Sequence, residues 1–197
     1  MIRYPNGSEG PVLPKKNKNP NLANAANRGM GLEEDINNAN AYYNDKQIAL
    51  ITKRPTPINI VKVDYTKGAR ITDAYFEHQS TTDYNGIYRG KYLDFEAKST
   101  RSKTSFPLGN ISVHQIAHLK RVIKQGGIAF FIICFSVLDE YFVIDASYVI
   151  DCFENSAKKS ISLETIKKVG CSIRQGFTPR LFYLEAVDQL YFKKSLL

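Results

Sequence analysis

The segment 81–98 holds the residues of this chain whose types and spacing best suit chemistry. Residues 91–98 alternate between polar and apolar side chains, as expected of a strand with one face on a core. On such a strand Glu96 and Lys98 point to the same side. A reversal marked by glycines precedes the strand and would bring Asp83 close to Glu96. The sequence therefore predicts two carboxylates and a lysine at one place.

Two carboxylates beside a lysine suit hydrolysis assisted by a hard divalent cation. Mg2+ takes a few carboxylate oxygens together with water and phosphate oxygens. Asp83 and Glu96 would supply the carboxylates, and Lys98 would hold the attacking water or offset charge on a phosphate group. Thr81 would place its hydroxyl on the same side as Asp83 if this stretch is extended. The alternative is an ordinary charged strand face that meets only water, because this spacing is common.

The charge of the chain favours an anionic partner. The formal net charge is +8 over 197 residues, and the stretch 97–138 contains no Asp or Glu. The cations of this stretch are Lys98, Arg101, Lys103, Lys120, Arg121 and Lys124. A basic stretch directly after the carboxylates suits a DNA phosphate backbone that approaches a cation site. The alternative is a generic basic surface.

One globular domain with a basic tail is the expected organisation. Residues 1–27 are rich in Asn, Pro, Gly and Lys and predict a flexible tail, which would fold over nucleic acid or only solubilise the chain. Residues 28–197 have the length and composition of one domain. Three widely spaced cysteines read as reduced thiols, and no apolar run approaches a membrane span. We expect a cytoplasmic protein without membrane contact.

Two helices are expected to bring further polar groups to the carboxylates. Residues 28–43 carry an apolar stripe at helical spacing, and Glu33 beside it would turn towards the cation. The alternative is that Glu33 only complements the helix dipole. Residues 110–124 predict a second helix, on which Gln115 would coordinate the cation or orient its water. Two histidines of this helix are four residues apart but lack the intervening glutamate of a zinc protease.

The remaining segments predict an α/β fold. A short strand at 47–52 precedes a proline-rich break and two extended segments, which read as a protruding arm or as an ordinary hairpin of the sheet. Residues 128–135 form the continuous apolar run of a fully buried strand. A partner strand is expected at 141–144, and further helices are expected at 147–153, 162–169 and 185–192. This alternation of helices and strands argues against a pure β-sandwich.

These residues and several further motifs resemble the RecU family of Holliday-junction resolvases, in the PD-(D/E)xK nuclease superfamily. The main motif is the run S-T-T-D-Y-N-G-I-Y-R-G-K-Y-L-D-F-E-A-K at 80–98. Further motifs are M-I-R-Y-P-N-G at 1–7, N-R-G-M at 27–30, R-P-T-P at 54–57, T-S-F-P-L at 104–108 and His114-Gln115. The resemblance implies a restriction-endonuclease-like fold, with a central mixed sheet flanked by helices and a protruding β stalk at about 55–79.

The resemblance also implies a function and a set of site residues. The family cuts four-way DNA junctions symmetrically as a homodimer with Mg2+ or Mn2+, leaves 5′-phosphate ends, and is linked to regulation of the RecA recombinase. By position, the metal site would consist of Thr81, Asp83, Glu96 and Gln115. Lys98 would assist the transition state, and Glu33 would contribute from the first helix. On the stalk, Arg70 and Phe76 are the candidates for junction contacts.

Two rival functions remain open on the sequence. A different PD-(D/E)xK nuclease would cut linear duplex DNA without a junction. A non-catalytic architectural protein would bind junction DNA and keep its function when Glu96 is replaced by Ala. The carboxylates and the arm argue against the architectural protein.

Overall fold

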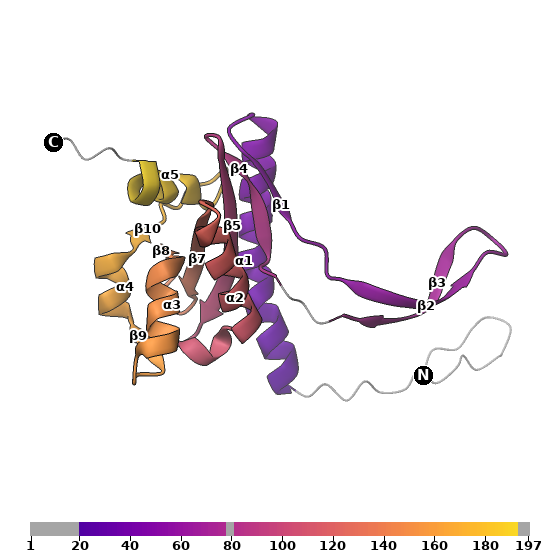
Figure 1. The fold of residues 1–197 in the computed structure, drawn as a ribbon, viewed down its shortest axis with the longest axis horizontal. Helices are drawn as coiled ribbons and strands as arrows, with labels where there is room; N and C mark the ends of the chain where they lie inside the picture. The colour runs from indigo at the N-terminus through magenta and orange to yellow at the C-terminus, as the bar shows by residue number, and fades with distance from the viewer. Residues whose placement is uncertain (1–19, 78–80, 193–197) are drawn as a thin grey trace, which may run out of the picture.

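The computed structural model describes residues 20–77 and 81–192, with the backbone alone in 20–30 (Figure 1). Its centre is a mixed six-stranded sheet in the order β1-β4-β5-β7-β8-β10. The strands are β1 Leu50–Lys53, β4 Tyr84–Tyr88, β5 Lys91–Thr100, β7 Ile128–Phe135, β8 Glu140–Asp145 and β10 Cys171–Ser172. Neighbouring strands are antiparallel except β5 and β7, which run parallel. A parallel pair needs a crossover connection, and a helix supplies it.

Helices cover both faces of this sheet. They are α1 Pro20–Asp45, α2 Val113–Lys124, α3 Ala146–Asn155, α4 Leu163–Val169 and α5 Tyr183–Val187, which continues as the π-helix Asp188–Phe192. A smaller sheet pairs β6, Ser105–Pro107, with β9, Ser160–Ser162, and the 3-10 turn Leu108–Asn110 follows β6. In the described part of the chain, no helix is both long and apolar enough to cross a membrane.

Strand β7 shows why the sheet has a core on each side. Its apolar run sends Phe130 and Ile132 into one core and Phe131 and Ile133 into the other. The first core lies under α1 and α5, and the second lies under α2, α3 and α4. The expectation of a fully buried strand at 128–135 is confirmed.

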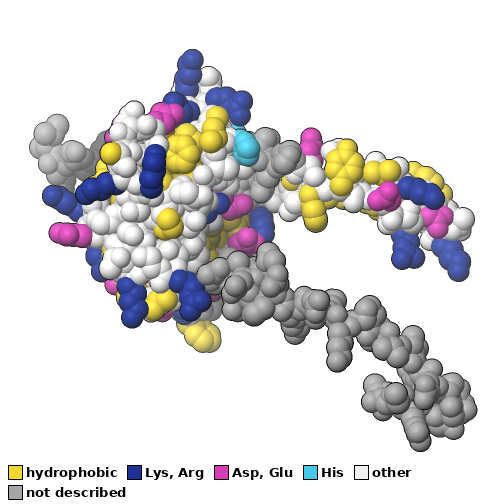
Figure 2. Space-filling view, turned by 90° about the horizontal axis from the view of Figure 1, so that it is seen from below, with side chains coloured by type: hydrophobic (Ala, Val, Ile, Leu, Met, Phe, Trp, Pro, Cys, Tyr) yellow, Lys and Arg dark blue, Asp and Glu magenta, His cyan; other side chains and the backbone are white. Residues whose placement is uncertain are grey.

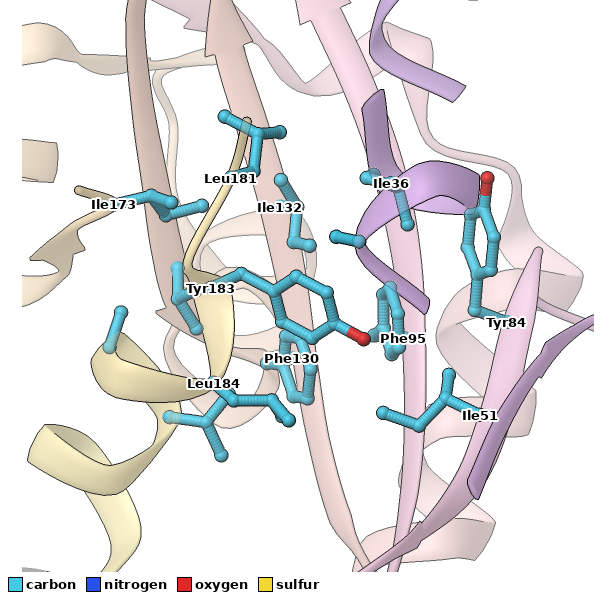
Figure 3. Close-up of a cluster of buried hydrophobic side chains, with 14 of the residues drawn as sticks. Ile36, Ile51, Tyr84, Phe95, Phe130, Ile132, Ile173, Leu181, Tyr183 and Leu184 are labelled. Carbon is cyan, nitrogen blue, oxygen red and sulfur yellow. The ribbon is translucent and has the colours of Figure 1, made fainter. Parts of the chain in front are cut away.

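Aromatic rings hold the central strands in register. Phe95 of β5 stacks on Phe130 of β7 with 4.6 Å between ring centroids, and on Tyr84 of β4 with 5.0 Å. Figure 3 shows these rings in the first core beside Tyr183 of α5, whose ring lies 5.5 Å from that of Phe95. Because β4 and β5 are fixed in this way, polar side chains on the opposite face of β5 have a rigid support.

Helix α1 begins earlier than expected. Residues 20–27, expected in the tail, belong to the helix, so the predicted helix start at residue 28 is wrong. Proline at the first helical position has a suitable φ, and the alanines that follow are strong helix formers. These signals outweighed the missing apolar periodicity. The rest of the expected tail, 1–19, lies outside the described residues.

The other expected elements are present with shifted bounds. The strand expected at 47–52 is β1, and the partner expected at 141–144 is β8. The helix expected from residue 110 begins only at Val113, because a 3-10 turn and the N-cap Ser112 precede it. The last expected helix, 185–192, is divided between α5 and the π-helix.

A β-hairpin projects from this body, and we call residues 55–77 the stalk (Figure 1). Its strands, β2 Ile58–Asp64 and β3 Arg70–Phe76, form a separate two-stranded sheet, so the expected arm is confirmed. Prolines separate it from β1 because proline cannot donate to a strand ladder. Figure 2 shows hydrophobic side chains along its surface. The exposed ones are Ile58, Ile60, Val61, Tyr65, Ile71, Tyr75 and Phe76. Such a surface marks a site of interaction.

Candidate active site

Asp83 and Glu96 lie side by side, one just before β4 and the other within β5. The antiparallel register pairs Tyr84 with Phe95, so the residue before Tyr84 falls opposite Glu96. The backbone N–H of Asp83 donates to Oε2 of Glu96 at 3.2 Å. In turn, the backbone N–H of Ala97 donates to Oδ2 of Asp83 at 3.4 Å. The reversal before β5 thus brings the two carboxylates together.

Lys98 and Gln115 both contact the Glu96 carboxylate. Nζ of Lys98 lies 2.7 Å from Oε1 of Glu96, and Nε2 of Gln115 donates to the same oxygen at 2.5 Å. The carbonyl oxygen of Gln115 accepts the backbone N–H of Ser112 at 3.0 Å, within a capping box that starts α2. The start of the helix therefore directs the amide of Gln115 at Glu96. A role for the Gln115 carbonyl as a cation ligand stays a prediction.

The Glu96 carboxylate is almost completely buried. Its side chain is only 1% exposed, so the alternative of a solvated strand face is wrong at this residue. Burial and the charge of Asp83 raise the pKa of Glu96 to about 8, although Lys98 lowers it. Two adjoining carboxylates beside one lysine leave negative charge that a divalent cation would offset. The donor set therefore fits a hard cation.

Glu33 lies at the margin of this site. Burial and the charges of Glu33, Asp83 and Glu96 raise the pKa of the Tyr84 hydroxyl, which is therefore in the field of all three carboxylates. The Glu33 carboxylate forms an ion pair with Lys53. Its turn towards a cation stays a prediction. Within residues 20–77 and 81–192, no group of three or more His, Cys, Asp and Glu side chains is arranged as a metal site.

Comparison with known proteins identifies the family of this chain. The family model "RecU: Recombination protein U" matches residues 27–189. The chain belongs to the RecU family. The Holliday junction resolvase RecU of Geobacillus kaustophilus (strain HTA426) is 47% identical over 203 residues, which cover 98% of this chain and 99% of that protein. The Holliday junction resolvase RecU of Bacillus cereus (strain B4264) is 46% identical over 197 residues, covering 97% and 98%.

A solved structure is also similar to this member of the RecU family. Hjc of Archaeoglobus fulgidus, a Holliday junction resolvase, is superposed with a TM-score of 0.44 at 12% identity, over 73% of this chain and 95% of that one. The expected family and its α/β fold, with a central mixed sheet flanked by helices and a β stalk, are confirmed.

A second buried carboxylate of this RecU-family chain, Asp94, lies two residues before Glu96 on the same side of β5. Its Oδ2 accepts a bond from Nη2 of Arg54 at 2.7 Å. Nε2 of His118 and the hydroxyl of Tyr92 each lie 2.9 Å from the same oxygen. The Thr82 hydroxyl donates to Oδ1. Burial alone raises the pKa of Asp94, but the bonds from His118, Thr82 and Arg54 hold it below its ordinary value. We call these five residues the Asp94 cluster.

Sequence reasoning missed the Asp94 cluster. Alternation placed Asp94 on the side of Glu96, but two of its partners, Arg54 and His118, come from distant segments. Arg54 directly follows β1, and His118 lies on α2. His118 therefore has a carboxylate partner, Asp94, at 2.9 Å.

The two threonines before Asp83 have different surroundings. Thr82 is fully buried and donates to Asp94, so its hydroxyl faces the Asp94 cluster. Thr81 is partly exposed. The assignment of Thr81 as a cation ligand stays a prediction.

The cations expected to bind DNA are spread over two regions of the body. Arg101 and Lys103 are exposed directly after β5, which carries Glu96 and Lys98. Lys120 and Arg121 are exposed on α2. Lys120 pairs with Glu154 at 2.8 Å, so its charge is partly offset in the free protein. DNA contacts by these residues stay predictions.

On the stalk, the two expected junction contacts lie far apart. Arg70 pairs in register with Asp64 at the outer end of the hairpin, and Phe76 pairs with Ile58 at the inner end. Phe76 is 79% exposed, which suits stacking on a base.

Proposed function

We propose that this chain is a structure-specific endodeoxyribonuclease that resolves Holliday junctions by paired symmetric nicks during recombination and DNA repair. The observation that carries the proposal is the buried Glu96 beside Asp83, with Lys98 and Gln115 on its carboxylate. Membership of the RecU family and the printed names of the relatives support the choice of junction DNA as substrate. A cytoplasmic location stays part of the proposal.

Mg2+ is the proposed cofactor, with Mn2+ as a substitute. Asp83 and Glu96 would hold it, and Thr81 and Gln115 would complete the set. When bound, the cation would supply Lewis acidity and lower the pKa of a water molecule. A bound cation would favour the ionised form of the Glu96 carboxylate, whose pKa is raised to about 8 by burial and by the charge of Asp83.

The side chains would then act on the phosphodiester as follows. The Lys98 side chain contacts Glu96 and is 21% exposed, and its ammonium would also contact a phosphate oxygen of the DNA. It would stabilise the charge that develops as water adds to phosphorus and the O3′–P bond breaks. Gln115 and Lys98 would hold the Glu96 carboxylate in one orientation. The products would be nicked duplexes with 5′-phosphate ends.

Selection of the junction would depend on the stalk and on a second copy of the chain. A homodimer would place two sites across a two-fold symmetric junction, which accounts for paired nicks. The exposed aromatic side chains Tyr75 and Phe76 would enter the junction centre, and Arg101 and Lys103 would contact phosphates beside the site. An interaction with the RecA recombinase belongs to the same proposal.

The test uses a synthetic four-way junction and a linear duplex of the same sequence, each with Mg2+ or EDTA. We expect wild type to make paired symmetric nicks in the junction with Mg2+ only. Lys98→Ala is expected to bind the junction but to lower cleavage about 100-fold or more, because it removes charge stabilisation from the transition state. Lys158→Ala, which removes an exposed lysine elsewhere, is the control and should cut normally.

Three results would contradict the proposal in different ways. Equal cutting of the linear duplex would indicate another nuclease on this fold. Junction binding without cleavage in Mg2+ or Mn2+ would indicate an architectural protein. Normal cleavage by Lys98→Ala would remove Lys98 from the active site.

A further inference from the structure

The Asp94 cluster places a charged group where neither DNA nor solvent reaches it. The Asp94 side chain is 0% exposed, and both of its oxygens are bonded. A buried carboxylate is costly unless donors surround it, so its position is fixed by those donors. The segments from which these donors come therefore show what Asp94 holds in place.

The cluster joins the two segments that flank the stalk. Arg54 is the last residue before the stalk, and Thr82 lies in the segment that leads from the stalk to β4. Nη1 of Arg54 donates to the Thr82 hydroxyl at 2.7 Å, and both side chains bind Asp94. The chain on either side of the stalk is therefore held by one carboxylate of β5.

The same cluster holds the segment that carries Asp83. The backbone N–H of Arg54 donates to the carbonyl oxygen of Asp83 at 2.8 Å, while the Arg54 side chain holds Thr82, its neighbour. Asp94 and Glu96 lie on the same side of one strand. A shift of Asp94 or its partners would thus change the distance between the Asp83 and Glu96 carboxylates.

We infer that Asp94 is a positioning residue: by holding the segments on either side of the stalk through Arg54 and Thr82, it sets Asp83 against Glu96 for cation binding. His118, on α2, supports this arrangement through its contact with the Asp94 carboxylate. The catalytic consequence of this inference rests on the proposed function. If Asp94 holds the base of the stalk, cleavage would depend on the position of the stalk relative to the body. It does not require Asp94 to touch the cation or the DNA.

The opposing view is that Asp94 only stabilises the fold. A purely structural carboxylate would affect the free energy of unfolding and leave cation affinity unchanged. A positioning residue would change cation affinity in protein that is still folded. Cation affinity therefore separates the two views, and it does so without any DNA.

The experiment measures Mn2+ binding to the full chain without DNA, by the electron paramagnetic resonance signal of free Mn2+. Asp94→Asn is expected to weaken binding about 10-fold to 100-fold, as loss of a supporting group beside a metal site does. His118→Leu should weaken it in the same direction, and His118→Gln, which keeps a donor at the end of the side chain, should restore it. The control is Tyr183→Phe. It removes a buried hydrogen bond from the Tyr183 hydroxyl to Asn40 at 2.5 Å, in the first core under α1 and α5.

The expected pattern is normal Mn2+ affinity in Tyr183→Phe despite lower stability, and weak affinity in Asp94→Asn and His118→Leu. Folded Asp94→Asn with wild-type affinity would overturn the inference. If Asp94→Asn does not fold, wild-type affinity in His118→Leu would overturn it instead.

A parallel assay separates this inference from the proposed function. Junction affinity is measured in EDTA, and single-turnover cleavage is measured with Mg2+. Asp94→Asn should cut about 10-fold or more slowly even at a protein concentration that saturates the junction. Failure of wild type to cut would reject the proposed function, while the Mn2+ titration would still decide the role of Asp94.

Discussion

At the scale of single residues, Glu96 predicts a specific dependence of stability on pH. Burial and Asp83 raise its pKa from 4.5 to about 8. The folded state therefore binds a proton that the unfolded state has released between these values. Because the folded state holds more protons in this window, the free energy of unfolding falls as pH rises from 4.5 to about 8.

Glu96→Gln is the variant that tests this dependence. It removes the titrating group and keeps the shape, so its stability should fall less steeply across the same window. The measurement is urea unfolding from pH 4.5 to 8.5 without divalent cations, with the window taken from the pKa of Glu96. Parallel pH profiles for wild type and variant would contradict the buried, proton-binding Glu96. Added Mg2+ should stabilise wild type most at the upper end of the window, where Glu96 is ionised.

At the residue scale, some contacts of the candidate site could be predicted from the sequence and others could not. Strand alternation predicted that Glu96 and Lys98 share a side, and the glycine-marked reversal predicted that Asp83 joins them. Those contacts are local in sequence. The Asp94 cluster was not predictable in this way, because Arg54 and His118 meet Asp94 only after β1 and α2 have packed on the sheet.

At the scale of elements, the close pairing of β1 with β4 predicts the effect of Gly86→Ala. A Cβ at Gly86 would lie 2.1 Å from the carbonyl oxygen of Leu50 and 2.7 Å from Cα of Ile51. Both atoms are backbone of β1, so the edge strand must move. The variant should lose about 1–3 kcal/mol of unfolding free energy, the usual cost of overpacking.

The control for Gly86→Ala is Gly109→Ala. An added Cβ at Gly109 has no neighbour within 4 Å, and this glycine lies in a short turn away from β1. Urea unfolding of both variants measures the difference. Equal stability of the two variants would contradict the close approach of β1 to β4.

Elements with a strong apolar pattern, either a continuous run or a periodic stripe, were the predictable ones. The apolar run at 128–135 gave β7, and the stripe along 28–43 gave most of α1. The start of α1 was missed because residues 20–27 have helix-forming alanines but no apolar stripe. The split of the last helix into α5 and a π-helix depends on packing over the sheet, for which the sequence has no local signal.

At the scale of the whole molecule, the stalk is a separate unit attached to a complete body. Its two strands bond only to each other within the described sheets, and neither hydrophobic core includes a stalk residue among its buried members. Its exposed apolar side chains gain nothing from folding of the body. The body should therefore fold without it, provided that Arg54 and Thr82 remain to close the Asp94 cluster.

Replacing residues 58–76 by a short Gly-Ser linker tests this division of roles. The shortened chain should keep the urea midpoint of wild type, because no core contact is lost, and it should still bind Mn2+ through Asp83 and Glu96. It should lose its preference for a four-way junction over a linear duplex. Phe76→Ala, which keeps the arm, is the matched variant and isolates the contribution of one aromatic ring. A shortened chain that unfolds early would show that the stalk supports the body, and one that still selects junctions would assign that selectivity to the body.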